Sequence, residues 1–140
     1  MGWKLIAEAV RTRLATDTGA GGLFNSTSPL VNATYFVQAA QESAPPYLVM
    51  VPVSETDLHA FNASARARQH LLQVSIFTDQ FDGAANSDAI AERLHVMLHR
   101  WTPTITGYVV SEILHNGCQG PFIDQDSMHR IEEFAVFISQ

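Results

Sequence analysis

The stretch from Gln69 to Trp101 constrains the fold more than any other part of the chain, because it contains two different periodicities in succession. From His70 to Phe77 apolar side chains recur at every second position, and one side of this segment collects Leu72, Val74 and Ile76. A period of two is typical of a β-strand that buries one face. We therefore expect a strand at 70–77 whose buried face needs a covering layer.

The second half of this stretch has the period of a helix. Asp82 and Gly83 interrupt the strand pattern, and Asp82 is a suitable residue to cap a helix N-terminus. From about Ala84 onward the apolar residues form one stripe, which consists of Ile90, Leu94, Met97, Leu98 and Trp101. The opposite side is largely polar and carries Asp88, Glu92, His95 and His99. We expect the helix to end before Pro103, because a residue that precedes proline avoids helical angles.

The remaining chain supplies a second helix and further strands. A helix is expected from Trp3 to Leu14, followed by a turn of small residues. The other expected strands are 33–38, 47–53, 108–114 and 128–139, and the expected loops are 23–32, 54–68 and 116–126. These elements predict one α+β domain over residues 1–140, in the order α-β-β-β-α-β-β. We expect a mainly antiparallel sheet of about four to five strands with two helices packed on one face.

The composition limits the classes of partner. The chain has a net charge of -6 at pH 7, and its single lysine is Lys4. Non-specific binding to nucleic acid depends on many Lys and Arg side chains, so a surface that grips DNA is not expected. No apolar run approaches the roughly 20 residues that span a bilayer, and 1–10 does not have the pattern of a signal peptide. The lone Cys118 excludes an internal disulfide and fits synthesis in a reducing cytosol.

Two histidines offer the strongest hint of a metal site. His95 and His99 are four residues apart on one helical face, with Glu92 one turn earlier, and this spacing can hold a metal. No third ligand is evident, although the chain also contains His70, His115 and His129. The alternative is a solvated helix face near the C-terminus, where histidines interact favourably with the helix dipole. We expect no bound metal and no cofactor.

No catalytic arrangement is visible elsewhere. Cys118 follows His115 by three residues, but the intervening Asn116-Gly117 favours a turn over a working nucleophile and base. Glu132 and Glu133 are neighbours in a strand, so their side chains point to opposite faces and cannot act as a pair. We interpret both as exposed to water or to a neighbouring subunit. The chain is therefore not expected to be an enzyme.

Several segments together resemble a known family, the tail-completion or tail terminator proteins of long-tailed bacteriophages and phage-derived particles. The matching features are an N-terminal helix with a small-residue turn and Leu23-Phe24, the strands PPYLVM and HLLQVSIF, the break at Asp82-Gly83, the helix AIAERLHVMLHR and the final FAVFIS. The order of these segments carries the resemblance over most of the chain. The longer, more polar segment at 23–44 departs from the family pattern.

The resemblance implies a structural protein of the virion that is assembled in the host cytoplasm. Members of this family form a hexameric ring on the tail tube, stop its growth and dock it to the head-side connector protein, while DNA passes through without specific binding. The partners it implies are further copies of the chain, the tail tube protein and the connector, with no membrane. The alternatives are another ring adaptor of the neck, such as a head-closure protein, or a small metal-dependent enzyme built on Glu92, His95 and His99.

A closed ring requires two different, complementary patches on each subunit. The candidate interface residues are the large apolar and aromatic side chains Tyr47, Leu48, Met50, Leu58, Phe61, Phe134, Val136 and Ile138. For each of them the alternative is ordinary packing inside the subunit. Leu58 and Phe61 lie in the polar segment 54–68, where they either tuck beneath it or project toward a partner.

Overall fold

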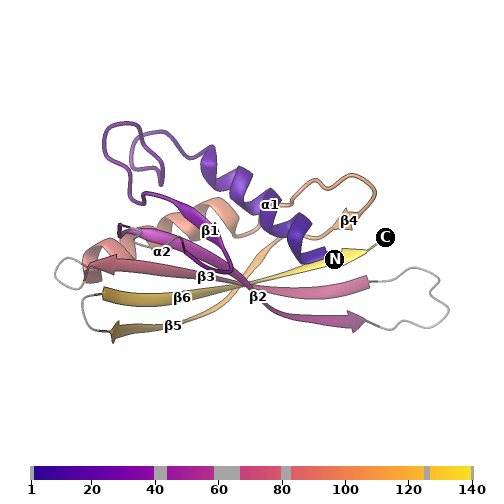
Figure 1. Ribbon diagram of the computed structural model, residues 1–140. Helices are drawn as coiled ribbons and strands as arrows, with labels where there is room; N and C mark the ends of the chain where they lie inside the picture. The colour runs from indigo at the N-terminus through magenta and orange to yellow at the C-terminus, as the bar shows by residue number, and fades with distance from the viewer. Residues whose placement is uncertain (1, 40–43, 59–66, 80–82, 125–126, 140) are drawn as a thin grey trace.

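The computed structural model describes residues 2–39, 44–58, 67–79, 83–124 and 127–139. Two helices, α1 (Gly2–Ala15) and α2 (Gly83–Leu98), lie over the same face of one sheet (Figure 1). The strands are β1 (Thr34–Phe36), β2 (Tyr47–Leu58), β3 (Ala67–Asp79), β4 (Val109–Val110), β5 (Leu114–Asp124) and β6 (Ser127–Ser139). The predicted α+β class and order of elements are confirmed, with one strand more than expected.

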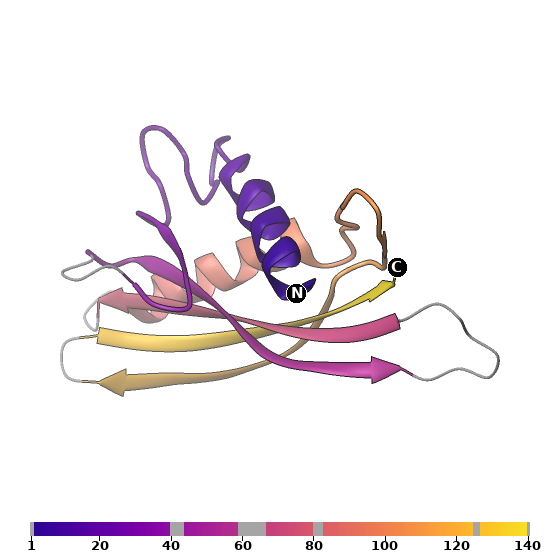
Figure 2. The same ribbon diagram turned by 45° about the vertical axis from the view of Figure 1, so that its right-hand side comes forward.

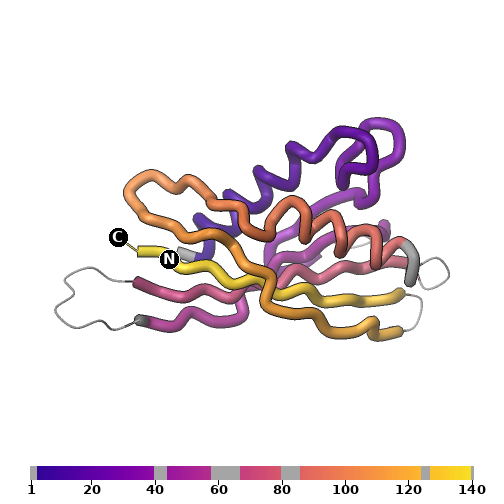
Figure 3. Tube along the Cα trace, turned by 180° about the vertical axis from the view of Figure 1, so that it is seen from behind, coloured from indigo at the N-terminus to yellow at the C-terminus, as the bar shows by residue number. Residues whose placement is uncertain are grey.

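The sheet is mixed and strongly twisted, as the turned view shows (Figure 2). Its strand order is β1-β2-β3-β6-β4, and β5 also pairs with β6, on the side away from β3. All neighbours are antiparallel except β1 and β2, which run parallel. Seen from behind, β5 forms the edge of the sheet next to β6 (Figure 3). The two ends of the sheet are therefore β1 with the outer side of β2, and β5 with β4.

The core lies between the sheet and the helices. The predicted stripe of β3 is buried there, as are the apolar residues of α1 at Ile6, Val10 and Leu14. In α2 the predicted stripe is buried from Ile90 to Leu98. The helix ends at Leu98, before the half-buried Trp101, because Arg100 takes a left-handed conformation with φ of 65°. The Trp101 N–H then donates to the carbonyl oxygen of Leu98 at 3.1 Å. The expected end before Pro103 is confirmed.

Two segments that were expected to be loops are strands. Residues 54–58 continue β2 beyond a bulge between Pro52 and Ser54, and most of 116–126 forms β5. The alternation of β5 is hidden in the sequence because its register against β6 shifts twice, once after His115 and again after Gln119. Each shift inserts residues that interrupt the period of two. Of the strand expected at 108–114, only β4 and the first residue of β5 are formed.

A buried ion pair fixes the turn after α1 against α2. Arg93 of α2 donates from Nε to Oδ2 of Asp17 at 2.6 Å, and its second nitrogen pairs with Oδ1 of the same carboxylate. The N–H of Leu23 donates to Oδ2 at 2.9 Å. These hydrogen bonds, led by that from Arg93, lower the pKa of Asp17 although burial opposes them. Gly22 passes so close to the carbonyl oxygen of Asp17 that a Cβ would collide with it.

Candidate assembly surfaces

Most of the residues predicted at an interface lie in the core of the subunit. Leu48 and Met50 of β2, and Phe134, Val136 and Ile138 of β6, are all buried on the face that the helices cover. Their position corresponds to the alternative interpretation, packing within the chain. Both faces of 47–53 are apolar. The period of two therefore separates the residues of the two faces but does not predict which face the helices cover. In the folded subunit these five side chains are not available to a partner.

The end of β2 and the segment between β2 and β3 contain the other two apolar candidates, Leu58 and Phe61. Phe61 lies outside the described residues, and at Leu58 the structure describes the backbone alone. Their role in an interface stays a prediction. The ends of β2 and β3 are held together by Arg68, whose guanidinium donates to Glu55 at 2.6 Å and lies 3.0 Å from a carboxylate oxygen of Asp57. Ion pairs therefore join these two strands where they run side by side (Figure 1).

One histidine is buried next to these ion pairs. His70 of β3 is only 3% exposed, and neither ring nitrogen has a hydrogen-bond partner. The nearest carboxylate oxygen, on Glu55, is 3.8 Å from its Nε2. Burial lowers the pKa of His70, because removing the ring from water penalises its charged form.

The last candidate, Tyr47, belongs to a row of aromatic rings on the sheet face that carries no described helix. The ring centroids are 5.9 Å apart from Tyr35 to Tyr47, 5.0 Å from Tyr47 to Phe77 and 4.4 Å from Phe77 to His129. Phe122 of β5 follows at 6.1 Å from His129. Each ring comes from a different strand, so the row crosses β1, β2, β3, β6 and β5. Such cross-strand ring contacts stabilise the sheet itself.

A polar cluster lies between α2, β5 and β6, and it corrects the interpretation of Glu132. That side chain is buried instead of exposed: Nε2 of His115 lies 2.6 Å from its Oε2, and Nε of Arg130 donates to its Oε1 at 3.0 Å. Arg130 also pairs with Asp88 of α2. A buried carboxylate needs such partners. The period of two in 128–139 places Glu132 on the same face as Phe134 and Val136, and this was the signal in the sequence that its side chain is buried.

His95 of α2 and His99, which directly follows the helix, join this cluster. The rings of His95 and His99 stack at 4.4 Å, and His95 lies 5.4 Å from His115. The N–H of His115 donates to Nδ1 of His99 at 3.0 Å, which requires that nitrogen to be unprotonated. Desolvation, followed by the charges of neighbouring cationic groups, lowers the pKa of His99. Within the described residues, no group of three or more His, Cys, Asp or Glu side chains is arranged to hold a metal ion.

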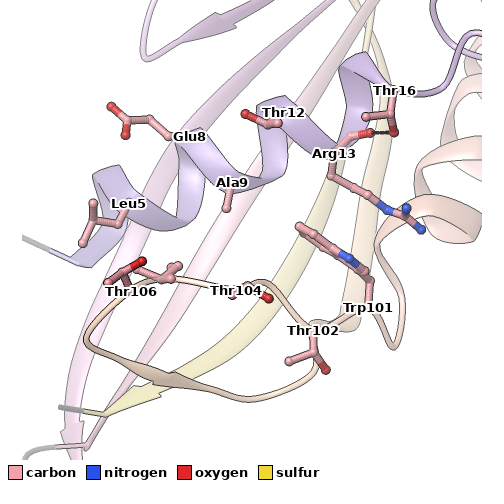
Figure 4. A pocket seen from close by; sticks show the side chains of 11 residues that line it. Leu5, Glu8, Ala9, Thr12, Arg13, Thr16, Trp101, Thr102, Thr104 and Thr106 are labelled. Atoms are coloured by element: carbon pink, nitrogen blue, oxygen red, sulfur yellow. Dashed lines mark hydrogen bonds between the residues drawn. The ribbon is translucent and has the colours of Figure 1, made fainter.

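An open groove runs between α1 and the segment after α2 (Figure 4). Its volume is about 670 Å³, and its walls carry Leu5, Glu8, Thr12, Trp101, Thr104 and Thr106 among others. Arg13 lies over the ring of Trp101, with 5.3 Å between the guanidinium carbon and the ring centroid, and donates to the carbonyl oxygen of Met97. The groove has hydroxyl groups but no pair of converging acid and base that would indicate catalysis.

Comparison with known proteins gave one family and a set of similar folds. A sequence model of the tail completion protein gp17 family matches residues 6–132. A chain in the solved virion of a native gene transfer agent particle is similar, with a TM-score of 0.72 and 16% identity over 95% of this chain and 93% of that one. A second solved structure has a TM-score of 0.64 and 16% identity over 99% and 96% of the two chains. No curated protein sequence matches. Among the described helices, none is long and apolar enough to cross a membrane.

Proposed function

Because the chain belongs to the tail completion protein gp17 family, we propose that it forms a ring on the end of the tail tube, stops tube growth there and joins the tail to the head connector. Its coarser role follows from the family itself: it is a structural protein of the virion that completes the tail. The observation that carries the proposal is the family match across residues 6–132.

The surfaces of the subunit support assembly over catalysis. Large apolar side chains remain exposed on several strands, at Val53, Leu114, Phe122 and Ile123, and at Val37 directly after β1. Isolated exposed apolar residues are ordinary, but several on the same edges of a sheet are typical of protein–protein contact. The polar clusters, by contrast, are occupied by ion pairs and hydrogen bonds inside the subunit. The chain therefore acts by binding copies of itself and its neighbours, with no bond made or broken.

Passage of DNA through the ring needs a wall that does not hold phosphates. The net charge of -6 favours this, because acidic walls repel the DNA backbone. On the sheet face without helices, the described residues of β2, β3, β5 and β6 include no lysine or arginine, because Arg68 and Arg130 alternate onto the other face. DNA therefore passes through the ring as cargo, without a specific binding site.

The test is tail joining in vitro. Lysates of a phage or particle that lacks this protein should contain unjoined heads and tails, and the purified protein should restore joined particles in proportion to the amount added. Electron microscopy should show rings on tube ends. Rings that bind isolated head connectors but never tube ends would instead make the protein a head-closure adaptor. A protein that stays monomeric with both partners present and restores no joining would refute the proposal.

A further inference from the structure

We propose that His99 is a pH-sensitive switch at the edge strand β5: its ring holds the main-chain N–H of His115 at neutral pH and releases it when the ring takes up a proton in acid. The switch belongs to the subunit itself and goes beyond the proposed function. The nitrogen of that N–H lies 3.0 Å from Nδ1 of His99. A neutral imidazole accepts a hydrogen bond at its unprotonated nitrogen, whereas the charged ring donates at both nitrogens. The contact therefore exists only while Nδ1 of His99 carries no proton.

The switch lies at the base of the segment between α2 and β5. Two main-chain hydrogen bonds join the same two stretches of chain: the N–H of Arg100 donates to the carbonyl oxygen of Ile113 at 2.7 Å, and the N–H of Ile113 donates to that of Trp101 at 2.8 Å. Main-chain amides do not titrate, so both bonds persist in acid, and Ile113 is buried beside them. Protonation of His99 therefore frees the N–H of His115 without unfolding the segment.

The side chain of His115 keeps its own anchor when the switch opens. Its Nε2 lies 2.6 Å from Oε2 of Glu132, whose side chain is buried. Nε2 carries a hydrogen both in the charged ring and in the neutral tautomer that is protonated there. His115 can therefore donate to Glu132 in either state, and the change in acid is confined to the contact with His99.

The surroundings of His99 favour its neutral form. Removal of the ring from water is the first cause, and the charge of His95, whose ring is stacked on it at 4.4 Å, is the second; together they lower the pKa of His99, and Glu112 opposes them more weakly. The titratable and charged groups around the three histidines come from every neighbouring element, and they are Asp88, Glu92, His95, Arg100, Glu112, His115, Cys118, Arg130 and Glu132. Because the closed form binds the proton of His99 less readily than the open form, a fall in pH favours release.

Release changes the edge of the sheet. β5 pairs with β6, and no described strand lies on its other side. An edge N–H without a partner can pair with another chain, and folded proteins commonly cover such groups. His99 covers one of them at neutral pH. The pH therefore controls whether the start of β5 is closed or open to pairing.

Amide hydrogen exchange at His115, followed by NMR between about pH 8 and about pH 5, tests the switch. In the wild type the opening equilibrium should rise up to about tenfold for each pH unit below about 6.5, the ordinary pKa of histidine, until the lower pKa of His99 is reached. His99→Asn supplies an amide oxygen that accepts a hydrogen bond without titrating. The exchange rate of this variant relative to the wild type should therefore fall in acid. An equal pH dependence in the two proteins would overturn the inference.

A second measurement uses the wild type alone, in case His99→Asn does not fold. The chemical shift of the His115 N–H should change with the same midpoint pH as the ring of His99, because the hydrogen bond is lost as that ring becomes charged. Different midpoints would overturn the inference. His95→Gln should move the midpoint to higher pH, because it removes a charge that lowers the pKa of His99. A midpoint that stays in place or falls would overturn the role of the cluster.

His70→Leu is the matched control, because burial lowers the pKa of His70 as well, at a site on β3 beside Glu55. This variant should change the pH dependence of global unfolding and leave that of exchange at His115 unaltered. If exchange at His115 changed with His70→Leu, the amide would open through global unfolding and the inference would fall. Tail joining by the wild type tests the proposed function separately, so either can fail without the other.

Discussion

Replacing Asp17 with asparagine should destabilise the subunit by about 2 kcal/mol, and the structure gives the reasons for that size. The Asp17 side chain is 3% exposed and accepts hydrogen bonds from two nitrogens of Arg93 and from the N–H of Leu23. Breaking a fully buried ion pair costs about 3–5 kcal/mol, while an exposed pair contributes about 0–1 kcal/mol. Arg93 is 31% exposed, so water recovers part of its loss and the cost falls between these limits.

The assay is thermal unfolding of Asp17→Asn beside a matched control, Asp88→Asn. Asp88 also pairs with an arginine, Arg130, but its side chain is 76% exposed. For a chain of this length, 2 kcal/mol corresponds to a fall of about 7 °C in Tm, whereas the control should lose about 2 °C or less. Equal losses in the two variants would refute the argument, because Asp17 is buried and accepts a further hydrogen bond from Leu23, whereas Asp88 is largely exposed.

The difference between wild type and Asp17→Asn should also depend on pH. Hydrogen bonding to Arg93 lowers the pKa of Asp17 from its ordinary value, so the folded protein holds the carboxylate charged more readily than the unfolded chain does. That contribution is complete above the unfolded pKa of about 4 and is lost as the pH falls through the lower folded pKa. Denaturant unfolding at pH 7, 4 and 3 should show the gap constant at first and then shrinking. A gap that widens in acid would contradict the assignment.

Three further substitutions test local features. Gly22→Ala should cost about 2 kcal/mol or more in denaturant unfolding, because its Cβ would collide with the carbonyl oxygen of Asp17, whereas Gly19→Ala meets nothing within 4 Å and should stay within about 0.5 kcal/mol. His70→Leu should stabilise the protein by about 1 kcal/mol, because it removes two buried nitrogens without partners. The wild type should lose stability below about pH 6.5, because the unfolded chain binds a proton at this histidine more readily than the folded protein, in which the pKa of His70 is lowered. In His70→Leu the free energy of unfolding should therefore depend less on pH in that range. An unchanged slope of the free energy of unfolding against pH would contradict this. Val37→Gly should raise the free energy of unfolding by about 0.5–1 kcal/mol, because relief of the positive φ, about 1–2 kcal/mol, exceeds the entropy cost of glycine.

The periodic parts of the sequence predicted the fold because burial of one apolar side determines how such a strand or helix packs. The stripe of Leu72, Val74 and Ile76 and the helical stripe from Ile90 to Leu98 both bury one side, and both are confirmed. β5 was not predicted from the sequence, because its pairing with β6 shifts register twice. Apolar residues such as Phe122 and Ile123 therefore do not recur with a constant period of two. A glycine-proline pair favours a loop in most sequences, and here it lies within a strand edge.

The interface residues were harder to predict than the fold. A period of two identifies the faces of a strand, but the decision which face the helices cover depends on tertiary packing. For this reason Leu48 and Phe134 were assigned to a possible contact and lie in the core. The error for Glu132 was the opposite one: its charge suggested exposure, but the side chain is buried between His115 and Arg130. The period of two places Arg130 on the same face as Glu132, whereas the pairing with His115 of β5 is not visible in the sequence.

The way β5 is held in place explains why its apolar side chains are free for assembly. Leu114 and Ile123 are exposed, while Phe122, although 48% exposed, also contacts the ring of His129. β5 is instead fixed by its ladder with β6 and by two polar contacts of His115, one to Glu132 and one to His99. Folding and assembly therefore depend on different atoms of the same strand. Ile123→Asp, at a side chain that is 70% exposed, should leave the Tm within about 2 °C of the wild type, while His115→Ala, which leaves the buried Glu132 with one partner fewer, should lower it by several degrees. If thermal unfolding showed the reverse order, the edge of β5 would belong to the core of the subunit and could not be its contact surface.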